Sequence, residues 1–207
     1  METQLTELPG LWQPLAALLL ASAVVMGSPG PSTISLTAVG ASFGIRRSLP
    51  YACGLIAGTI AVLLAVAAGL VALVTTIPHG TQVLGVLSAA YILYLAWKIA
   101  TAPPLGGRDE AARAPGVAGG VGLAVANPKA YLAIAAVFAG TTVIAGNSGL
   151  DSALKIALLS LMIVLIHLAW LLAGVSLSRW LRDPVAARLI NLAMAAALVV
   201  VTVLALV

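Results

Sequence analysis

The sequence predicts an all-α integral membrane protein with about six transmembrane helices, arranged as two inverted repeats of three helices each. Hydrophobic residues make up 62% of the 207 positions and charged residues only 8%, whereas a soluble domain carries roughly a quarter charged residues. The mean hydropathy is +1.14. The apolar runs are long and lack the period-two alternation of a membrane β-barrel, which favours helices.

Six apolar segments follow one another along the chain, and two of them are broken by proline. The first is interrupted at Ser28-Pro29-Gly30-Pro31 and the fourth at Asn127-Pro128-Lys129. An unbroken crossing needs about 20 residues, and the other four segments fit that length. Five or seven crossings result if the broken segments are counted differently. The segments lie near residues 11–43, 50–75, 81–101, 117–146, 154–178 and 185–207.

The spacing of these segments predicts a single transmembrane domain, residues 1–207, made of two related halves. The halves span about 1–105 and 114–207, with a linker at about 102–116. Three crossings per half is an odd number, so the repeats must be inverted relative to each other. The halves share little residue identity, and chance spacing remains the alternative.

The distribution of basic residues predicts the orientation. Eight of the ten Lys and Arg residues lie in the loops that follow the first, third and fifth segments. The opposite side has Lys155, with Glu2, Glu7 and Asp151. The positive-inside rule then places the N-terminus outside and the basic loops in the cytoplasm. Because the basic residues are spread over short loops, no nucleic-acid partner is expected.

The two breaks are candidate binding sites, because interrupted segments at corresponding places of two halves point to a transporter's site. Pro31 and Pro128 suit the first position of a new helix, and Asn127 suits an N-cap. Ser28 or Gly30 would end the preceding half-helix. Each break would then present a helix N-terminus, with free N–H groups and partial positive charge, to a carboxylate.

Lys129 strengthens this prediction. A cation in the first helical turn opposes the helix dipole and is costly inside a membrane, which suggests an anionic partner such as a substrate carboxylate. In the alternative interpretation the fourth helix starts at Asn127, and Lys129 reaches the cytoplasmic interface. The depth of this break is left open.

His167 lies near the middle of the fifth segment and would suit a coupled proton, since imidazole titrates near neutrality. The alternative is a neutral His bonded to a neighbouring helix. Tyr91 is read first as a packing or interfacial aromatic and second as a pore-lining residue. The six acidic residues lie outside the apolar segments, and no metal-ligand cluster, Walker loop or HExxH pattern occurs. We therefore expect no metal, no cofactor and no enzymatic activity.

Several motifs, in their order and spacing, resemble the LysE/RhtB family of bacterial amino-acid exporters over nearly the whole chain. The resemblance rests on the Pro-Gly-Pro motif at Pro29–Pro31, the Asn-Pro-Lys motif at Asn127–Lys129, and three further stretches. These stretches are Gly44-Ile45-Arg46-Arg47-Ser48, Ala89-Ala90-Tyr91-Ile92-Leu93-Tyr94-Leu95-Ala96-Trp97 and Arg188-Leu189-Ile190-Asn191.

The resemblance implies a multi-pass protein of the bacterial cytoplasmic membrane that exports amino acids or related metabolites, driven by the proton motive force. The family resemblance alone also implies a homodimer. The chain departs from the family pattern at Ser32, where Asn or Gly is common, at Thr59, where many members have Asp, and at residues 116–120. The missing Asp counts against proton coupling and against recognition of a cationic substrate.

The predicted function is therefore a secondary exporter of amino acids or related small metabolites, and a neutral, aliphatic substrate is favoured over lysine or arginine. The binding site would be formed by the two breaks, at Ser28, Pro29, Gly30, Pro31, Ser32, Asn127, Pro128 and Lys129. Polar or proton-coupling candidates are His167, Thr59 and Tyr91. Lys129 and the helix ends would take the carboxylate, and free carbonyls around Ser28 and Ala126 the ammonium group. The alternative is a non-transporting scaffold that uses Gly40-x-x-x-Gly44 and Gly54-x-x-x-Gly58 to hold partner helices.

Overall fold

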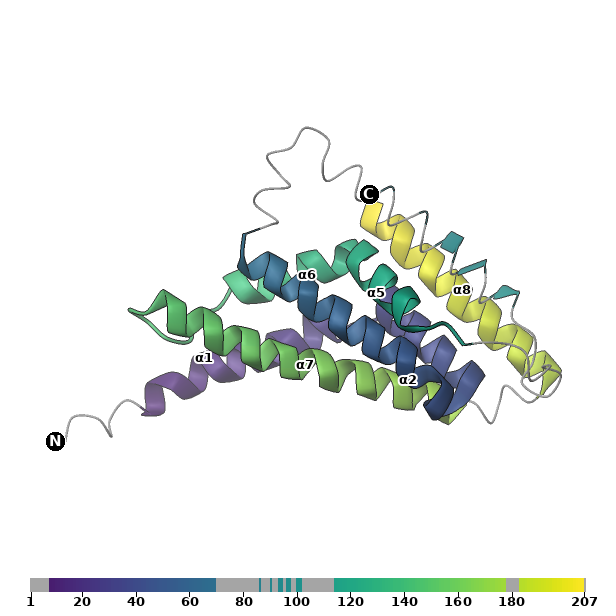
Figure 1. The fold of residues 1–207 in the computed structure, drawn as a ribbon, viewed down its shortest axis with the longest axis horizontal. Coiled ribbons are helices and arrows are strands. Elements are labelled where there is room, and N and C mark those ends of the chain that lie inside the picture. Colours follow the sequence, from purple (N-terminus) through teal and green to yellow (C-terminus); the bar gives the residue numbers. More distant parts are fainter. Residues whose placement is uncertain are drawn as a thin grey trace.

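The protein is a bundle of α-helices in a computed structural model (Figure 1). The structure describes residues 8–69, 114–177 and 183–206, with isolated positions between 86 and 101. Most of the predicted third segment, including Tyr91, lies outside the described residues. Within the described ranges every regular element is helical. The elements are α1 (Leu8–Ala21), η1 (Ser22–Met26), α2 (Pro31–Ala67), α5 (Val117–Ala126), α6 (Pro128–Ala139), α7 (Ser148–Leu177) and α8 (Pro184–Leu206).

Two of these helices, α2 and α7, are long and apolar enough to cross a membrane, and α5 with α6 makes a third candidate if the bent pair is one span. The prediction of an all-α membrane protein is confirmed at this level. Figure 1 shows α7 running beside α2, with α8 on the opposite flank of the bundle from α1.

Helix α2 is a hairpin of two helical arms that meet at Gly44. The backbone of Gly44 has φ 71° and ψ 175°, in a region that glycine adopts far more readily than other residues. A straight helix would separate residues 35 and 51 by about 24 Å. The hydroxyls of Ser35 and Tyr51 instead lie 2.6 Å apart, so the arms fold back on each other. Arg46 is exposed just after this turn, where a loop between the first two segments was predicted.

Small residues allow the second arm of α2 to pack closely on α5. Gly54 contacts the backbone of Val117, and a Cβ atom at Gly58 would lie 2.7 Å from the Cβ of Ala124. The predicted Gly54-x-x-x-Gly58 face therefore packs against this chain's own helix. Gly40 meets Leu171 of α7 in the same way. Gly40, Gly54 and Gly58 therefore pack within the chain, whereas no described atom lies within 4 Å of a Cβ added at Gly44.

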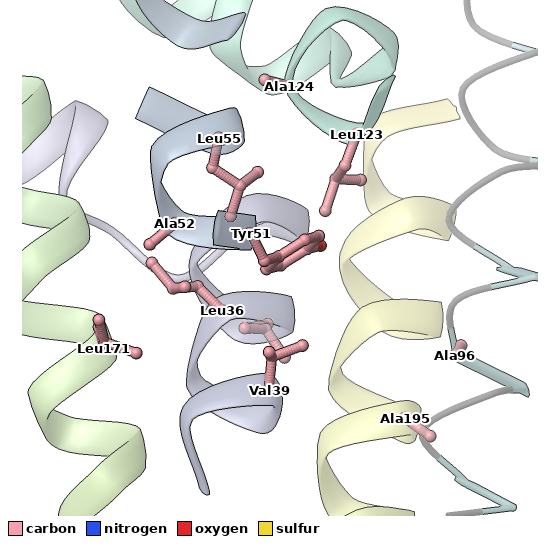
Figure 2. Close-up of a cluster of buried hydrophobic side chains, with 11 residues drawn as sticks. Leu36, Val39, Tyr51, Ala52, Leu55, Ala96, Leu123, Ala124, Leu171 and Ala195 are labelled. Atoms are coloured by element: carbon pink, nitrogen blue, oxygen red, sulfur yellow. The ribbon is translucent and has the colours of Figure 1, made fainter. Parts of the chain in front are cut away.

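Two clusters of buried hydrophobic residues hold the bundle together. The first, shown in Figure 2, joins both arms of α2 with α5, α7 and α8, and its largest buried side chain is Tyr51. The second joins α1, the second arm of α2, α6 and α7, through Leu18, Leu63, Ile134 and Ile163 among others. In lipid, van der Waals packing of this kind is the main contribution to helix association.

The helices end near both proline motifs. Asn127 precedes Pro128 and has φ −85° and ψ 103°, the extended conformation that a following proline favours. Helix α5 therefore ends at Ala126, and α6 starts at Pro128 with a bend of 63°. At the first motif, α2 starts at Pro31 as predicted. The preceding helical stretch ends at Met26 with Gly27 as its cap, so the expectation that Ser28 or Gly30 ends it was wrong.

The predicted outer loop around Asp151 is also corrected. Helix α7 begins at Ser148, six residues before the predicted segment, and both Asp151 and Lys155 lie buried on it. A helix can bury these two charges because they are spaced four residues apart and form an ion pair, with 2.8 Å between Nζ and Oδ2. Charge alone is therefore a poor guide to the segment boundary here.

Candidate functional site

The two proline motifs, about 100 residues apart in sequence, lie together in space. The side-chain amide of Asn127 donates a hydrogen bond to the hydroxyl of Ser32, at 2.9 Å, which joins the first turn of α2 to the start of α6. The Asn127 side-chain oxygen accepts from the backbone N–H of Lys129 at 3.1 Å, which confirms its predicted role as N-cap. The Thr33 hydroxyl accepts from the Gly30 N–H at 2.9 Å.

The ammonium group of Lys129 connects α6 to the first break. It donates to the carbonyl oxygen of Ser28 at 2.6 Å, to the Ser28 hydroxyl at 2.7 Å and to the carbonyl of Pro29 at 2.8 Å. The Lys129 stem lies over Gly30, where an added Cβ would be 2.7 Å from its Cδ. The Ser28 carbonyl is therefore occupied by Lys129, contrary to the expectation that it is free for a substrate ammonium.

Helix α6 starts directly after Asn127, as the alternative interpretation of the fourth segment expects, and the depth of this break in the membrane stays a prediction. Helix α5 precedes Asn127, so the segment does not begin there, and the Lys129 ammonium turns toward the first break. No carboxylate lies within ion-pair distance of Lys129 in the part of the chain that the structure describes.

A cavity of about 40 Å³, partly open to its surroundings, lies beside Lys129. One part of its wall is polar and comes from the two breaks, the second arm of α2 and α7. The other part is apolar and comes from η1, α6 and α7. The lining residues are Met26, Ser28, Gly30, Ser32, Thr33, Thr59, Asn127, Lys129, Ala130, Ala133, Ile134, Ile163, Ile166 and His167.

His167 presents an unused acceptor in this wall. Its Nδ1 lies 2.7 Å from the carbonyl oxygen of Ile163, one turn earlier on α7. A carbonyl only accepts, so Nδ1 carries the proton and Nε2 has a free lone pair. The residue is 5% exposed, and Nε2 is buried without a hydrogen-bond partner among the residues that the structure describes. The partner of His167 is thus its own helix, and not the neighbouring helix of the alternative interpretation.

The other predicted residues divide into three groups. Thr59 lines the cavity and donates its hydroxyl to the Leu55 carbonyl at 2.7 Å. The three prolines, Pro29, Pro31 and Pro128, are not among the lining residues, but they shape the backbone at the breaks. Tyr91 lies outside the described residues.

Sequence reasoning missed Trp170, which holds the first break in place. Its indole N–H donates to the carbonyl of Gly27 at 3.1 Å, and its own carbonyl accepts from the Thr37 hydroxyl at 3.2 Å. The available signal was its position three residues after His167, which places both on neighbouring parts of one helix surface. The apolar wall, including Ile163 and Ile166, was missed because single apolar residues in an apolar segment carry no signal.

The lining residues suit binding better than catalysis. Ser32 and His167 line the same cavity, but Ser32 accepts from Asn127, and no carboxylate lines the wall. The described residues contain no group of three or more His, Cys, Asp or Glu side chains that could hold a metal ion. The cavity instead has a cation that suits a carboxylate, a free acceptor that suits an ammonium group and an apolar wall that suits a side chain. These are the three parts of a small amino acid.

These features define a helical membrane protein with a cavity where the first turns of α2 and α6 meet. The LysE type translocator model matches residues 23–207, and the chain belongs to this family. Members of this family are transporters and not enzymes.

Named relatives of the chain are efflux proteins. It is 39% identical over 93 residues to the cysteine/O-acetylserine efflux protein of Klebsiella pneumoniae subsp. pneumoniae, covering 45% of this chain and 47% of the relative. It is 37% identical over 86 residues to the protein of the same name from Salmonella typhimurium, covering 42% and 43%. The chain thus spans about half the length of the curated relatives it matches. No solved structure gives a significant match.

Proposed function

We propose that this protein is a secondary exporter of small, neutral amino acids and related zwitterionic metabolites across the cytoplasmic membrane, driven by the proton motive force. The observation that carries the proposal is the Lys129 ammonium, which lies at the wall of this cavity without a carboxylate partner among the described residues. Lys129 is half-buried. A partly desolvated cation without a counter-ion favours an anionic ligand, and an amino-acid carboxylate is one such ligand.

The site geometry supports this assignment of roles. The first turns of α2 and α6 meet at the cavity, so both helix dipoles place partial positive charge there. The substrate carboxylate would lie between these turns and Lys129. Since no acidic residue lines the cavity, a second positive charge on the substrate would find no counter-ion, which favours neutral side chains. Relatives named for efflux of cysteine and O-acetylserine are consistent with this size and charge.

The element order supports the proposed six crossings in two inverted repeats. In each half a short helix leads to a break, a proline begins the next helix, and a turn leads into a long helix. Pro31 corresponds in this way to Pro128. The turn at Gly44 corresponds to residues 140–147, and the second arm of α2 corresponds to α7. We propose that the N-terminus lies outside, that the breaks lie within the membrane, and that one half rocks against the other to alternate access.

An efflux assay in cells loaded with dipeptides tests the proposal. Wild-type cells should release neutral amino acids faster than cells without the protein, and an uncoupler should stop uphill release. Lys129→Ala and Pro29→Ala should reduce release to the background rate, since the first removes the carboxylate partner and the second alters the break.

Matched controls keep the test specific. Arg47→Gln removes an exposed cation from α2, and Pro184→Ala changes the exposed first residue of α8; both should export as wild type does. If Lys129→Ala and Pro29→Ala release every amino acid at the wild-type rate, the site assignment is wrong. If wild-type cells release no amino acid faster than the background rate, the exporter function itself is rejected.

A further inference from the structure

We infer that the Nε2 lone pair of His167 is a single acceptor that the substrate's ammonium group and the driving proton occupy in turn. This inference rests on the proposed function, and it assigns both the ammonium site and the coupling step to one atom. The starting point is that His167 lines the cavity and that its Nε2 is buried without a partner in the described part of the chain, although buried polar atoms in proteins are nearly always hydrogen-bonded.

The other polar side chains of the cavity wall each make at least one hydrogen bond, including Thr59, whose hydroxyl donates to the Leu55 carbonyl. Lys129 donates to the Ser28 carbonyl, the Ser28 hydroxyl and the Pro29 carbonyl. The Ser32 hydroxyl accepts from Asn127, and the Thr33 hydroxyl accepts from the Gly30 N–H. Nε2 of His167 is therefore the lining atom best placed to receive an N–H from a ligand, with the ligand's carboxylate held by Lys129.

The charges around His167 prevent the substrate's ammonium group and the proton from occupying Nε2 at the same time. The cavity walls that face it come from the first break, α2 and α6, and Lys129 is the only charged side chain among these lining residues. On α7 itself, Lys155 lies twelve residues away, about 18 Å along the helix, and is paired with Asp151. A protonated His167 would have no lone pair for the ammonium and would repel it, with no lining carboxylate to offset that repulsion.

One shared lone pair fixes the stoichiometry. A substrate leaves only from neutral His167, and the transporter returns with a proton on Nε2, so one proton enters for each substrate exported. An amino acid with a neutral side chain carries no net charge near neutral pH. Each cycle therefore moves one positive charge inward, and both the pH gradient and the membrane potential drive export.

The test is binding of radiolabelled L-cysteine, kept reduced, and of L-serine to the purified full-length protein in detergent between pH 5 and pH 8. For wild type we expect Kd to rise as pH falls, approaching about tenfold per pH unit where His167 is protonated. Adding ligand at low pH in weak buffer should release protons. His167→Gln keeps an acceptor but cannot bind a proton, so its Kd should not vary with pH and no proton should be released.

Two further variants complete the design. His167→Leu removes the acceptor and should weaken binding about tenfold or more at every pH, as expected for loss of a hydrogen bond to a charged group. Ser176→Ala removes an exposed hydroxyl from the same helix and should behave as wild type. The pH dependence of wild type alone decides the outcome if a His167 variant fails to fold.

The outcomes separate this inference from the proposed function. A wild-type Kd that is constant with pH, or a His167→Gln variant that keeps the wild-type slope, would overturn the inference while export stands. A Kd that instead rises as pH increases would assign the titration to Lys129 and would also overturn it. If wild type binds neither amino acid, the proposed function fails, and the inference with it.

Discussion

The two ends of α6 each meet a lysine ammonium group, and the two groups have opposite surroundings. At the C-terminal end, Lys155 of α7 donates to the carbonyls of Phe138 and Thr141 at 2.8 and 3.0 Å and pairs with Asp151 at 2.8 Å. At the N-terminal end, Lys129 donates to three oxygen atoms of Ser28 and Pro29, none of them charged.

The helix dipole makes this contrast larger. A cation near the C-terminus of a helix is stabilised by the dipole, whereas a cation in the first turn is opposed by it. Lys155 therefore has a carboxylate and a favourable dipole, and Asp151 is satisfied in turn by the backbone N–H groups of Val143 and Ile144. Lys129 has neither. The comparison indicates that Lys155 is structural, and it supports the proposal that Lys129 binds a ligand.

The largest expected effect is at the structural end. Lys155→Met should lower the free energy of unfolding by about 3–5 kcal/mol, because it leaves the Asp151 carboxylate buried without its counter-ion. Thermal unfolding of the purified protein in detergent measures this loss. The double variant Lys155→Met, Asp151→Leu should recover part of it, since no lone charge then remains. An unchanged melting temperature in the single variant would contradict the structural role of Lys155.

Lys129→Met should change the free energy of unfolding by no more than about 1 kcal/mol, because the lost hydrogen bonds are offset by relief of the unfavourable dipole and of desolvation. The same variant should lose export. Thermal unfolding and the efflux assay, run on one preparation, give both values. A loss of stability equal to that of Lys155→Met would show that Lys129 is a structural residue and would contradict the comparison.

The sequence predicted the local features of this site and not the contacts across it. Asn127 as N-cap and the prolines at the starts of α2 and α6 follow from rules that act within a few residues. The bonds from Lys129 to Ser28 join residues 101 apart, so they depend on how α6 packs beside the first break. The sequence indicated Lys129 as a candidate because a cation in the first turn of a membrane helix is unfavourable. The sequence did not show that the ammonium group of Lys129 binds backbone carbonyls.

The Lys155 and Asp151 pair was misplaced for a related reason. Charged residues near the end of an apolar segment are usually in loops, and the prediction followed that tendency. Their i, i+4 spacing was visible in the sequence and is the signal that indicated a helix. For His167, its place on α7 was predictable, whereas the free Nε2 atom could be found only after the bond to Ile163 was known.

The smallest effect is expected at the cap that positions Lys129. Asn127→Ala removes the bond to the Lys129 N–H and the bond to Ser32, and should cost about 1 kcal/mol of stability. Asn147→Ala is the matched control, because Asn147 accepts from the Leu150 N–H at 3.0 Å at the start of α7, away from the cavity. Both variants should lose similar stability in thermal unfolding. Only Asn127→Ala should also weaken substrate binding, by a few-fold, since it loosens the turn that carries Lys129. Equal binding by both variants would show that the cap at α6 supports the fold alone, and that Lys129 keeps its position through its contacts with Ser28 and Pro29.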